Sequence, residues 1–382
     1  MTVGSTPRRL GRLQRGLTPF VVAWLLWLCP GTLWAAEPAN PYASASTRAV
    51  LRYLEDLPSH PSNRVLIGQF IGHAAPPGQA AALRDPWVGY RMDVEKLQRR
   101  TGKWVALVGA DYARLSNDAT VDLARANEPL IAHWRQGGLV TVSWHARNPW
   151  TGGDARDHAG SERFDELLTP GTEAYATWMR ALDEVADALA QLQKAGVVVL
   201  WRPFHESNEP PFWWGQGMAT SPPPAQVVAL WRRMFEYFTL TKRLNNLLWV
   251  YAATASEKPG AQSEWLCYPG DEFVDVVGLD VYADRLTLGA YEAMRALRKP
   301  MGLTEFGPSE ETARARSYDY GQLMPQIESR YPGLSFVFCW GGSSRPPRPA
   351  WGLLANRHAD QLLRHPWVIT RDEVDWKAYL PH

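Results

Sequence analysis

The stretch VVVLWRPFHE, residues 197–206, decides the fold, because it combines an apolar strand pattern with ionisable residues directly after it. Val197–Pro203 is a short run of β-branched and aromatic residues, typical of a strand that is buried on both faces. It follows a long helical pattern, Thr172–Lys194. His205 and Glu206 stand where the loop after the strand begins. A buried strand that ends in ionisable side chains predicts a parallel sheet with a site at its carboxyl edge.

Apolar runs of the same kind recur on both sides of this stretch, with helical patterns between them. The other predicted strands are Val65–Phe70, Trp104–Ala110, Leu139–Trp144, Leu247–Tyr251, Val274–Leu279, Pro300–Glu305 and Leu334–Trp340. The other predicted helices are Thr47–Leu57, Asp122–Arg135, Ala225–Lys242, Leu288–Arg298 and Tyr318–Arg330. Strands that alternate with helices predict an α/β fold, a (β/α)₈ TIM barrel in a single domain. A doubly wound open sheet is the rival, although no G-x-G-x-x-G follows the first strand.

The amino terminus resembles an export signal rather than part of the barrel. Basic residues precede an apolar run, Phe20–Cys29, which is shorter than the roughly 20 residues of a membrane span. We therefore predict a signal peptide at 1–35, a polar amino-terminal segment at 36–63 and a catalytic domain at 64–382. The expected location is periplasmic or extracellular, with no stable membrane association after cleavage. Cys267 and Cys339 then either form a disulfide or remain two buried thiols.

Composition excludes some partners. The 382 residues include 40 basic and 39 acidic side chains, and this balance argues against nucleic acid as a partner. The 19 Trp are unusual, because an excess of flat apolar rings either fills a core or lines a cleft for polyhydroxylated ligands. Composition alone does not choose between these roles, and it says nothing about the oligomeric state.

Chemistry-bearing side chains stand at the predicted strand ends. They are Asp111, Tyr112, Trp144, His145, Arg202, His205, Glu206, Asp280, Tyr282, Glu305 and Trp340. Glu206 and Glu305 follow strands that lie across the barrel mouth from each other. Glycosidic bond cleavage needs one acid to protonate the leaving oxygen and a second carboxylate to attack or to activate water. A spacing of about 5–5.5 Å between the two carboxyl groups would predict retention of configuration.

Neighbouring residues add to this hypothesis. Arg202 and His205 are placed to orient carboxylates through charge-assisted hydrogen bonds. The Trp213–Trp214 pair offers a stacking surface for a sugar ring, and we expect Trp214 to face the ligand. Trp144 and Trp340, which end strands, are expected to border the cleft.

Other classes of function have weaker signals. A metal-dependent hydrolase is not favoured, because no two of the nine His are separated by a single residue and no H-E-x-x-H is present. A binding protein without catalysis would not need both Glu206 and Glu305. No G-x-S-x-G indicates a serine hydrolase. Neither the motifs nor the chemistry requires a cofactor.

With these residues assembled, the sequence resembles glycoside hydrolase family 26, the β-mannanase family. The resemblance is carried by WRPFHE at 201–206, FWWG at 212–215, SWHARNP at 143–149, TGG at 151–153, VDVVGLDVY at 274–282 and LTEFG at 303–307, with GQF at 68–70 and GADY at 109–112. It implies a retaining, endo-acting hydrolase of β-1,4-mannan, with Glu206 as acid/base and Glu305 as nucleophile.

The resemblance also assigns the residues around the scissile sugar. It implies that His205, Trp214, Tyr282 and Trp340 shape the subsite and that Trp144 and His145 border it. Tyr282 is expected to hydrogen-bond the nucleophile. One position departs from the family, because Pro211 stands where a Trp is common. The related activities on mixed-linkage β-glucan, β-1,3-xylan or an exopolysaccharide therefore stay open.

Overall fold

The computed structural model describes residues 1–2, 4, 37–75, 85–114, 122–255, 263–341 and 348–381. The predicted export signal at 1–35 lies almost wholly outside the described residues. The chain divides after Ala35 into two units, and the second of them, Ala36–His382, contains the fold. Among the residues described, no helix is both long enough and apolar enough to cross a bilayer.

Eight parallel strands close into a barrel. They are β1 (Val65–Ala75), β2 (Leu107–Arg114), β3 (Leu139–Trp144), β4 (Val199–Pro203), β5 (Leu247–Thr254), β6 (Val276–Tyr282), β7 (Met301–Gly307) and β8 (Leu334–Cys339). They pair in chain order, and β1 closes the barrel by pairing with both β8 and β2. A short strand, β9 (Val368–Ile369), pairs with the start of β1. The predicted (β/α)₈ barrel is confirmed.

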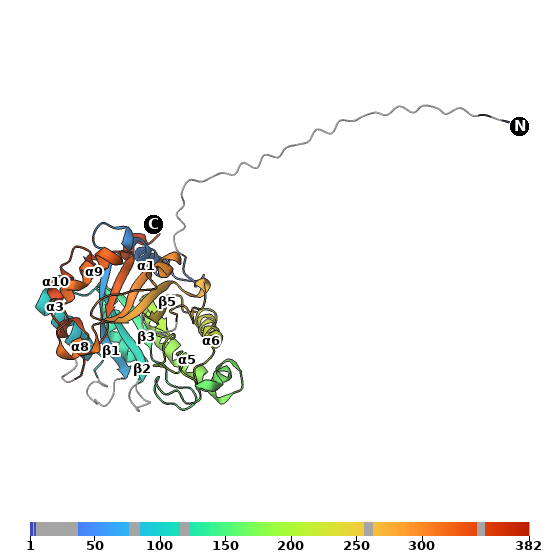
Figure 1. Ribbon diagram of the computed structural model, residues 1–382, viewed down its shortest axis with the longest axis horizontal. Helices are drawn as coiled ribbons and strands as arrows, with labels where there is room; N and C mark the ends of the chain where they lie inside the picture. The colour runs from blue at the N-terminus through green and yellow to red at the C-terminus, as the bar shows by residue number, and fades with distance from the viewer. Residues whose placement is uncertain are drawn as a thin grey trace. The chain divides into compact units, whose positions relative to one another are not determined.

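Helices surround the strands (Figure 1). They are α1 (Ala45–Asp56), α3 (Lys96–Thr101), α4 (Asn127–Arg135), α5 (Glu173–Lys194), α6 (Pro224–Glu236), α7 (Tyr291–Ala296), α8 (Glu310–Ala315), α9 (Leu323–Arg330) and α10 (Ala359–Leu363). The longest, α5, begins where the Thr172 side chain accepts a hydrogen bond from the Tyr175 N–H, as N-cap residues do. Its buried residues Trp178, Leu182 and Val185 recur at helical spacing, so one face packs on the barrel.

The strands at the site run further than their apolar patterns predict. β6 continues to Tyr282 and β7 to Gly307, with Asp280 opposite Glu305 in the register. These polar residues therefore lie within the strands and not after them. Backbone pairing continues past the apolar run because the barrel, and not the side chain, supplies the hydrogen-bond partners. Conversely, Val105 forms only an isolated antiparallel bridge with Thr370, so β2 begins later than predicted.

The barrel interior is a packed core. Phe336 and Phe338 fill it with aliphatic residues from the other strands. A Cβ on Gly109 would come within 2.5 Å of the Phe338 ring, so glycine makes room for this aromatic. The same cluster includes residues of α1, and the Ser335 hydroxyl donates to the Leu54 carbonyl at 2.7 Å. The predicted amino-terminal segment, 36–63, therefore carries a helix that packs against the barrel core.

The two remaining cysteines do not form a disulfide. Cys267 and Cys339 are both buried free thiols. Burial raises the pKa of the Cys267 thiol to about 11 and that of Cys339 to about 12, so both stay protonated near neutral pH. Of the two alternatives that the sequence left open, the structure supports the pair of buried thiols.

Candidate active site

Glu206 follows β4 in a strained turn. Phe204 and Glu206 both have φ near +50°, at 47° and 55°, in the left-handed region that non-glycine residues seldom adopt. Such positions cost about 1–3 kcal/mol each and persist only where the surroundings hold them. Here the Glu206 N–H donates to the Ala252 carbonyl of β5 at 3.0 Å. The turn therefore sets Glu206 firmly at the carboxyl end of the barrel.

Glu305 lies on β7 and is held by two donors, one to each carboxylate oxygen. Arg202 donates from Nη2 to Oε1 at 2.5 Å, and the Tyr282 hydroxyl donates to Oε2 at 2.5 Å. Arg202 also donates from Nη1 to Asp280 at 3.0 Å, and Thr304 donates to the other oxygen of Asp280. The predicted contacts of Arg202 and Tyr282 with the carboxylates are confirmed. Glu305 is thus fixed with a defined orientation, as a nucleophile needs to be.

The two glutamates come together at the mouth of the barrel. One carboxylate oxygen each of Glu206, Asp280 and Glu305 lies within 4.8 Å of the others. A separation of this size matches the retaining class, since inverting enzymes leave about 6.5–9.5 Å between the carboxyl groups for a water molecule. Three carboxylates at this distance would also attract a cation, and Arg202 already supplies that charge to Asp280 and Glu305.

The electrostatics separate the roles of the two glutamates. Burial raises the pKa of Glu206 well above its usual value, and the negative charges of Glu305 and Asp280 raise it further. Glu206 is therefore protonated at pH values where an ordinary glutamate is ionised, as a general acid should be. Burial would lower the pKa of Arg202, but Asp280 and Glu305 outweigh it and raise that pKa. Arg202 thus remains a cation beside Glu305.

Two histidines form a chain beside Glu206. His145 pairs through Nδ1 with Asp111 at 2.8 Å, and its Nε2 lies 3.1 Å from Nε2 of His205. Burial, the charge of His145 and that of Arg202 lower the pKa of His205 well below its usual value, so His205 is neutral. Its Nδ1 is buried without a hydrogen-bond partner among the described residues. Neither nitrogen of His205 hydrogen-bonds a carboxylate of the described residues, so the prediction that His205 orients the carboxylates is wrong.

Two of the tryptophans that were predicted to face or border the cleft are buried instead. Trp214 is fully buried, its indole N–H donates to the His205 carbonyl at 2.9 Å, and its ring stacks on Phe212. The prediction that Trp214 faces the ligand is wrong, because the ring fixes the turn that carries His205 instead. Trp144 is 5% exposed and stacks on Trp178, so its expected place at the cleft border is also wrong.

Trp340 is the one predicted tryptophan that keeps a partly exposed face. Its ring stacks on Phe70 with centroids 3.9 Å apart, and the Arg202 guanidinium lies 5.7 Å from its centroid. Trp340 therefore lies beside Arg202, the residue that hydrogen-bonds Glu305. Its contact with a sugar remains a prediction.

Sequence reasoning missed three residues of this site. Asp111, which orients His145, was noted only as a strand end, and Phe212 packs edge-on against the rings of both His145 and His205. His73 on β1 lies near His145, with ring centroids 6.2 Å apart. The register of β1 on β2, which pairs His73 with Asp111, is the signal that would have found it.

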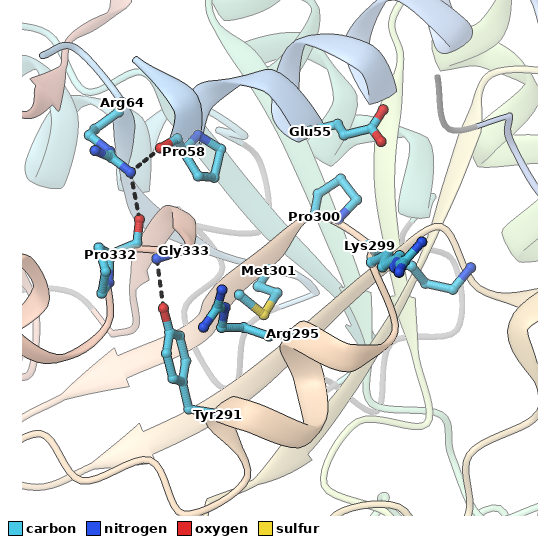
Figure 2. A pocket seen from close by; sticks show the side chains of 11 residues that line it. Glu55, Pro58, Arg64, Tyr291, Arg295, Lys299, Pro300, Met301, Pro332 and Gly333 are labelled. Atoms are coloured by element: carbon cyan, nitrogen blue, oxygen red, sulfur yellow. Dashed lines mark hydrogen bonds between the residues drawn. The ribbon is translucent and has the colours of Figure 1, made fainter. Parts of the chain in front are cut away.

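A cavity lies at the end of the barrel opposite the paired glutamates. It has a volume of about 460 Å³, and Met301 at the start of β7 lines it, whereas Glu305 lies near that strand's far end. Figure 2 shows its basic residues, with Arg64 donating to the Pro58 and Pro332 carbonyls. This cavity is therefore separate from the paired glutamates.

A test of the Tyr282 contact follows from the geometry. Tyr282→Phe should lower kcat by about 10–100-fold with little change in fold, because a hydrogen bond to a charged group contributes about 1.5–3 kcal/mol. Tyr268→Phe is the matched control, since that hydroxyl donates to Asp271 at the surface, 2.7 Å away. Steady-state kinetics and circular dichroism measure both variants. Equal kcat values for wild type and Tyr282→Phe would contradict this role.

An eight-stranded parallel barrel that brings an acid and a nucleophilic carboxylate together at the ends of β4 and β7 defines a retaining-type glycoside hydrolase. The model of glycosyl hydrolase family 26 matches residues 39–373. The chain belongs to this family.

Similar proteins match nearly the whole chain. A mannan endo-1,4-β-mannosidase of Bacillus subtilis is 31% identical over 348 residues, which are 88% of this chain and 89% of the relative. A second one, from Bacillus subtilis strain 168, is 28% identical over 93% of this chain and 94% of its own. The structure of the Bacillus subtilis mannanase BCman superposes with a TM-score of 0.76 at 29% identity, covering 88% of this chain and 95% of the other.

Proposed function

We propose that this protein is an endo-acting mannan hydrolase that cleaves β-1,4 linkages with retention of configuration. The observation that carries the proposal is the buried unit formed by Glu305, Arg202 and Tyr282, with the carboxyl of Glu206 within 4.8 Å. The mannosidase names of the similar proteins support mannan over a glucan or a xylan.

The geometry assigns each of these residues a role in a two-step hydrolysis. Glu305 attacks the anomeric carbon with the oxygens that Arg202 and Tyr282 orient, and Glu206 gives its proton to the departing glycosidic oxygen. The Glu305 ester then forms, its negative charge disappears, and the pKa of Glu206 falls. Ionised Glu206 next takes a proton from water, which attacks the same carbon and releases Glu305. Two inversions leave the configuration retained.

The raised pKa of Glu206 predicts the alkaline limb of the pH profile. The first step needs protonated Glu206, so kcat/KM should fall as pH rises through that pKa. Glu305→Gln removes one of the charges that raise the pKa, so Glu206 should titrate at lower pH in that variant. Carbon-13 NMR of labelled glutamate measures both values. A pKa of Glu206 that does not move in Glu305→Gln would contradict the coupling.

The substrate is tested with a polysaccharide panel. New reducing ends should appear with galactomannan and glucomannan, and not with mixed-linkage β-glucan or β-1,3-xylan. A rapid fall in viscosity at low conversion distinguishes internal cleavage from cleavage at an end. Activity on the glucan or xylan alone would overturn the mannan assignment and implicate Pro211. Polysaccharide binding by the folded protein without any new ends would overturn catalysis.

We also infer that the chain is exported and that the signal at residues 1–35 is removed. The basic residues, the short apolar run Phe20–Cys29 and the Ala35–Ala36 pair support this inference. Mass spectrometry of protein recovered from the periplasm and from the medium should show a new amino terminus near Ala36. Full-length protein found only inside the cell would contradict it.

A further inference from the structure

Three strands bring potential metal ligands together beside the catalytic residues. His73 on β1 pairs in register with Asp111 on β2, and Asp111 pairs with Ser143 on β3, two residues before His145. One side-chain nitrogen or oxygen each of His73, Asp111 and His145 lies within 4.8 Å of the others. Donors bound to one zinc ion at about 2.0–2.2 Å lie about 3.4 Å apart in a tetrahedron, so no pair of donors would need to move by more than about 1.5 Å. The pair of His145 Nδ1 and Asp111, which is 2.8 Å apart, would move outward to admit the ion.

The carboxylate of this cluster is held ready by its neighbours. Asp111 is fully buried, and it accepts hydrogen bonds from the Ser143 hydroxyl at 2.5 Å and from the backbone N–H groups of Ala113 and His145. Its ion pair is with His145, and no described lysine or arginine lies within salt-bridge distance of it. Metal sites in proteins use outer hydrogen bonds of this kind to orient their ligands.

His73 is the one residue of the cluster whose side chain has no polar partner among the described residues. It makes no hydrogen bond or ion pair with any described residue, and its ring packs edge-on against Phe70 and Trp340. The imidazole is half-buried. Aromatic packing therefore positions the ring, and neither nitrogen has a partner among the described residues that would compete with a ligand.

We propose that His73, Asp111 and His145 form a binding site for a borderline transition-metal dication of the zinc class. Two imidazoles and one carboxylate suit zinc, copper, nickel or cobalt, whereas magnesium and calcium prefer oxygen ligands throughout. Three protein ligands leave a coordination position for water. The spacing of histidines along the chain does not show this site, because each ligand comes from a different strand or strand end.

Bound metal should also slow turnover, a consequence that rests on the proposed function. His145 is one imidazole away from His205, which precedes Glu206 in the chain. A dication there favours the ionised form of Glu206, and an ionised Glu206 cannot protonate the leaving oxygen. The bound dication would also fix the position of His145 at the border of the active site. The site would therefore make the enzyme sensitive to zinc.

The experiment measures binding apart from activity. Zinc chloride is titrated calorimetrically into the metal-free, untagged chain, and cobalt(II) chloride is added in parallel to record visible d–d absorption. One high-affinity ion per chain is expected. His73→Ala should weaken zinc binding at least about 10–100-fold and abolish the cobalt spectrum. His358→Ala, which removes an exposed imidazole beside Asp319, should change neither.

The activity arm uses the same proteins. Zinc should inhibit the wild type and His358→Ala at the concentration that saturates binding, and it should not inhibit His73→Ala, when the activity of each protein is compared with its own activity without metal. Absence of a stoichiometric site, or binding unaffected by His73→Ala, would overturn the metal site. Binding that depends on His73 without any glycosidase activity would leave the site standing and overturn the proposed function instead.

Discussion

Glu305→Ala is expected to lower kcat on mannan by at least about four orders of magnitude while the protein stays folded. The carboxylate forms the covalent bond of the intermediate, and a methyl group offers no substitute. Both oxygens of Glu305 are engaged, by Arg202 and Tyr282, so its attack is also pre-oriented. Reducing-end release measures the loss, and circular dichroism checks the fold.

A small external nucleophile separates loss of the nucleophile from loss of the fold. Azide fits the space left by the carboxylate, so it should restore turnover of an activated aryl mannoside in Glu305→Ala and give the α-mannosyl azide. The matched variant Glu206→Ala should instead give the β-mannosyl azide, because Glu305 still attacks first. Full activity of Glu305→Ala without azide, or one product configuration in both variants, would contradict the assigned roles.

The fold and the catalytic pair are predictable from local signals. Short apolar runs in the sequence predict buried strands, and the strand β3 (Leu139–Trp144) has the bounds that its run predicts. Glu206 follows such a run and Glu305 ends another, and strand-end position in a parallel barrel is enough to place both at the mouth. What decides these features is short-range pattern and connectivity, which the sequence contains directly.

Whether an individual aromatic ring points into the core or into the cleft is not predictable from such local signals. Trp213 and Trp214 are adjacent, yet both are buried, because their indole N–H groups donate to two different carbonyls, those of Ala146 and His205. The cluster of His73, Asp111 and His145 is hidden for a related reason. Its members depend on the register between strands, which no spacing along one segment specifies.

Arg202→Met should destabilise the protein by about 3–5 kcal/mol, because it removes the only cation that forms an ion pair with Asp280 or Glu305 among the described residues. Arg202 is 2% exposed, so water does not replace it. Burial raises the pKa of Asp280 to about 7 even though the charge of Arg202 lowers it, so without that charge the pKa of Asp280 should be higher still. Stability of the variant should therefore be greatest at low pH and fall as pH rises from about 4, where unfolded carboxyls ionise.

Two companion variants make this prediction specific. Arg202→Met with Asp280→Asn removes one uncompensated charge, so it should recover part of the lost stability and weaken the pH dependence. Arg202→Lys keeps the charge but loses the fork that reaches Asp280 and Glu305 together, so it should remain more stable than Arg202→Met and still lose kcat. Urea unfolding from pH 4 to 8 measures all three. Equal stability of Arg202→Met at both ends of that range would mean that the carboxylates do not depend on Arg202 for their charge.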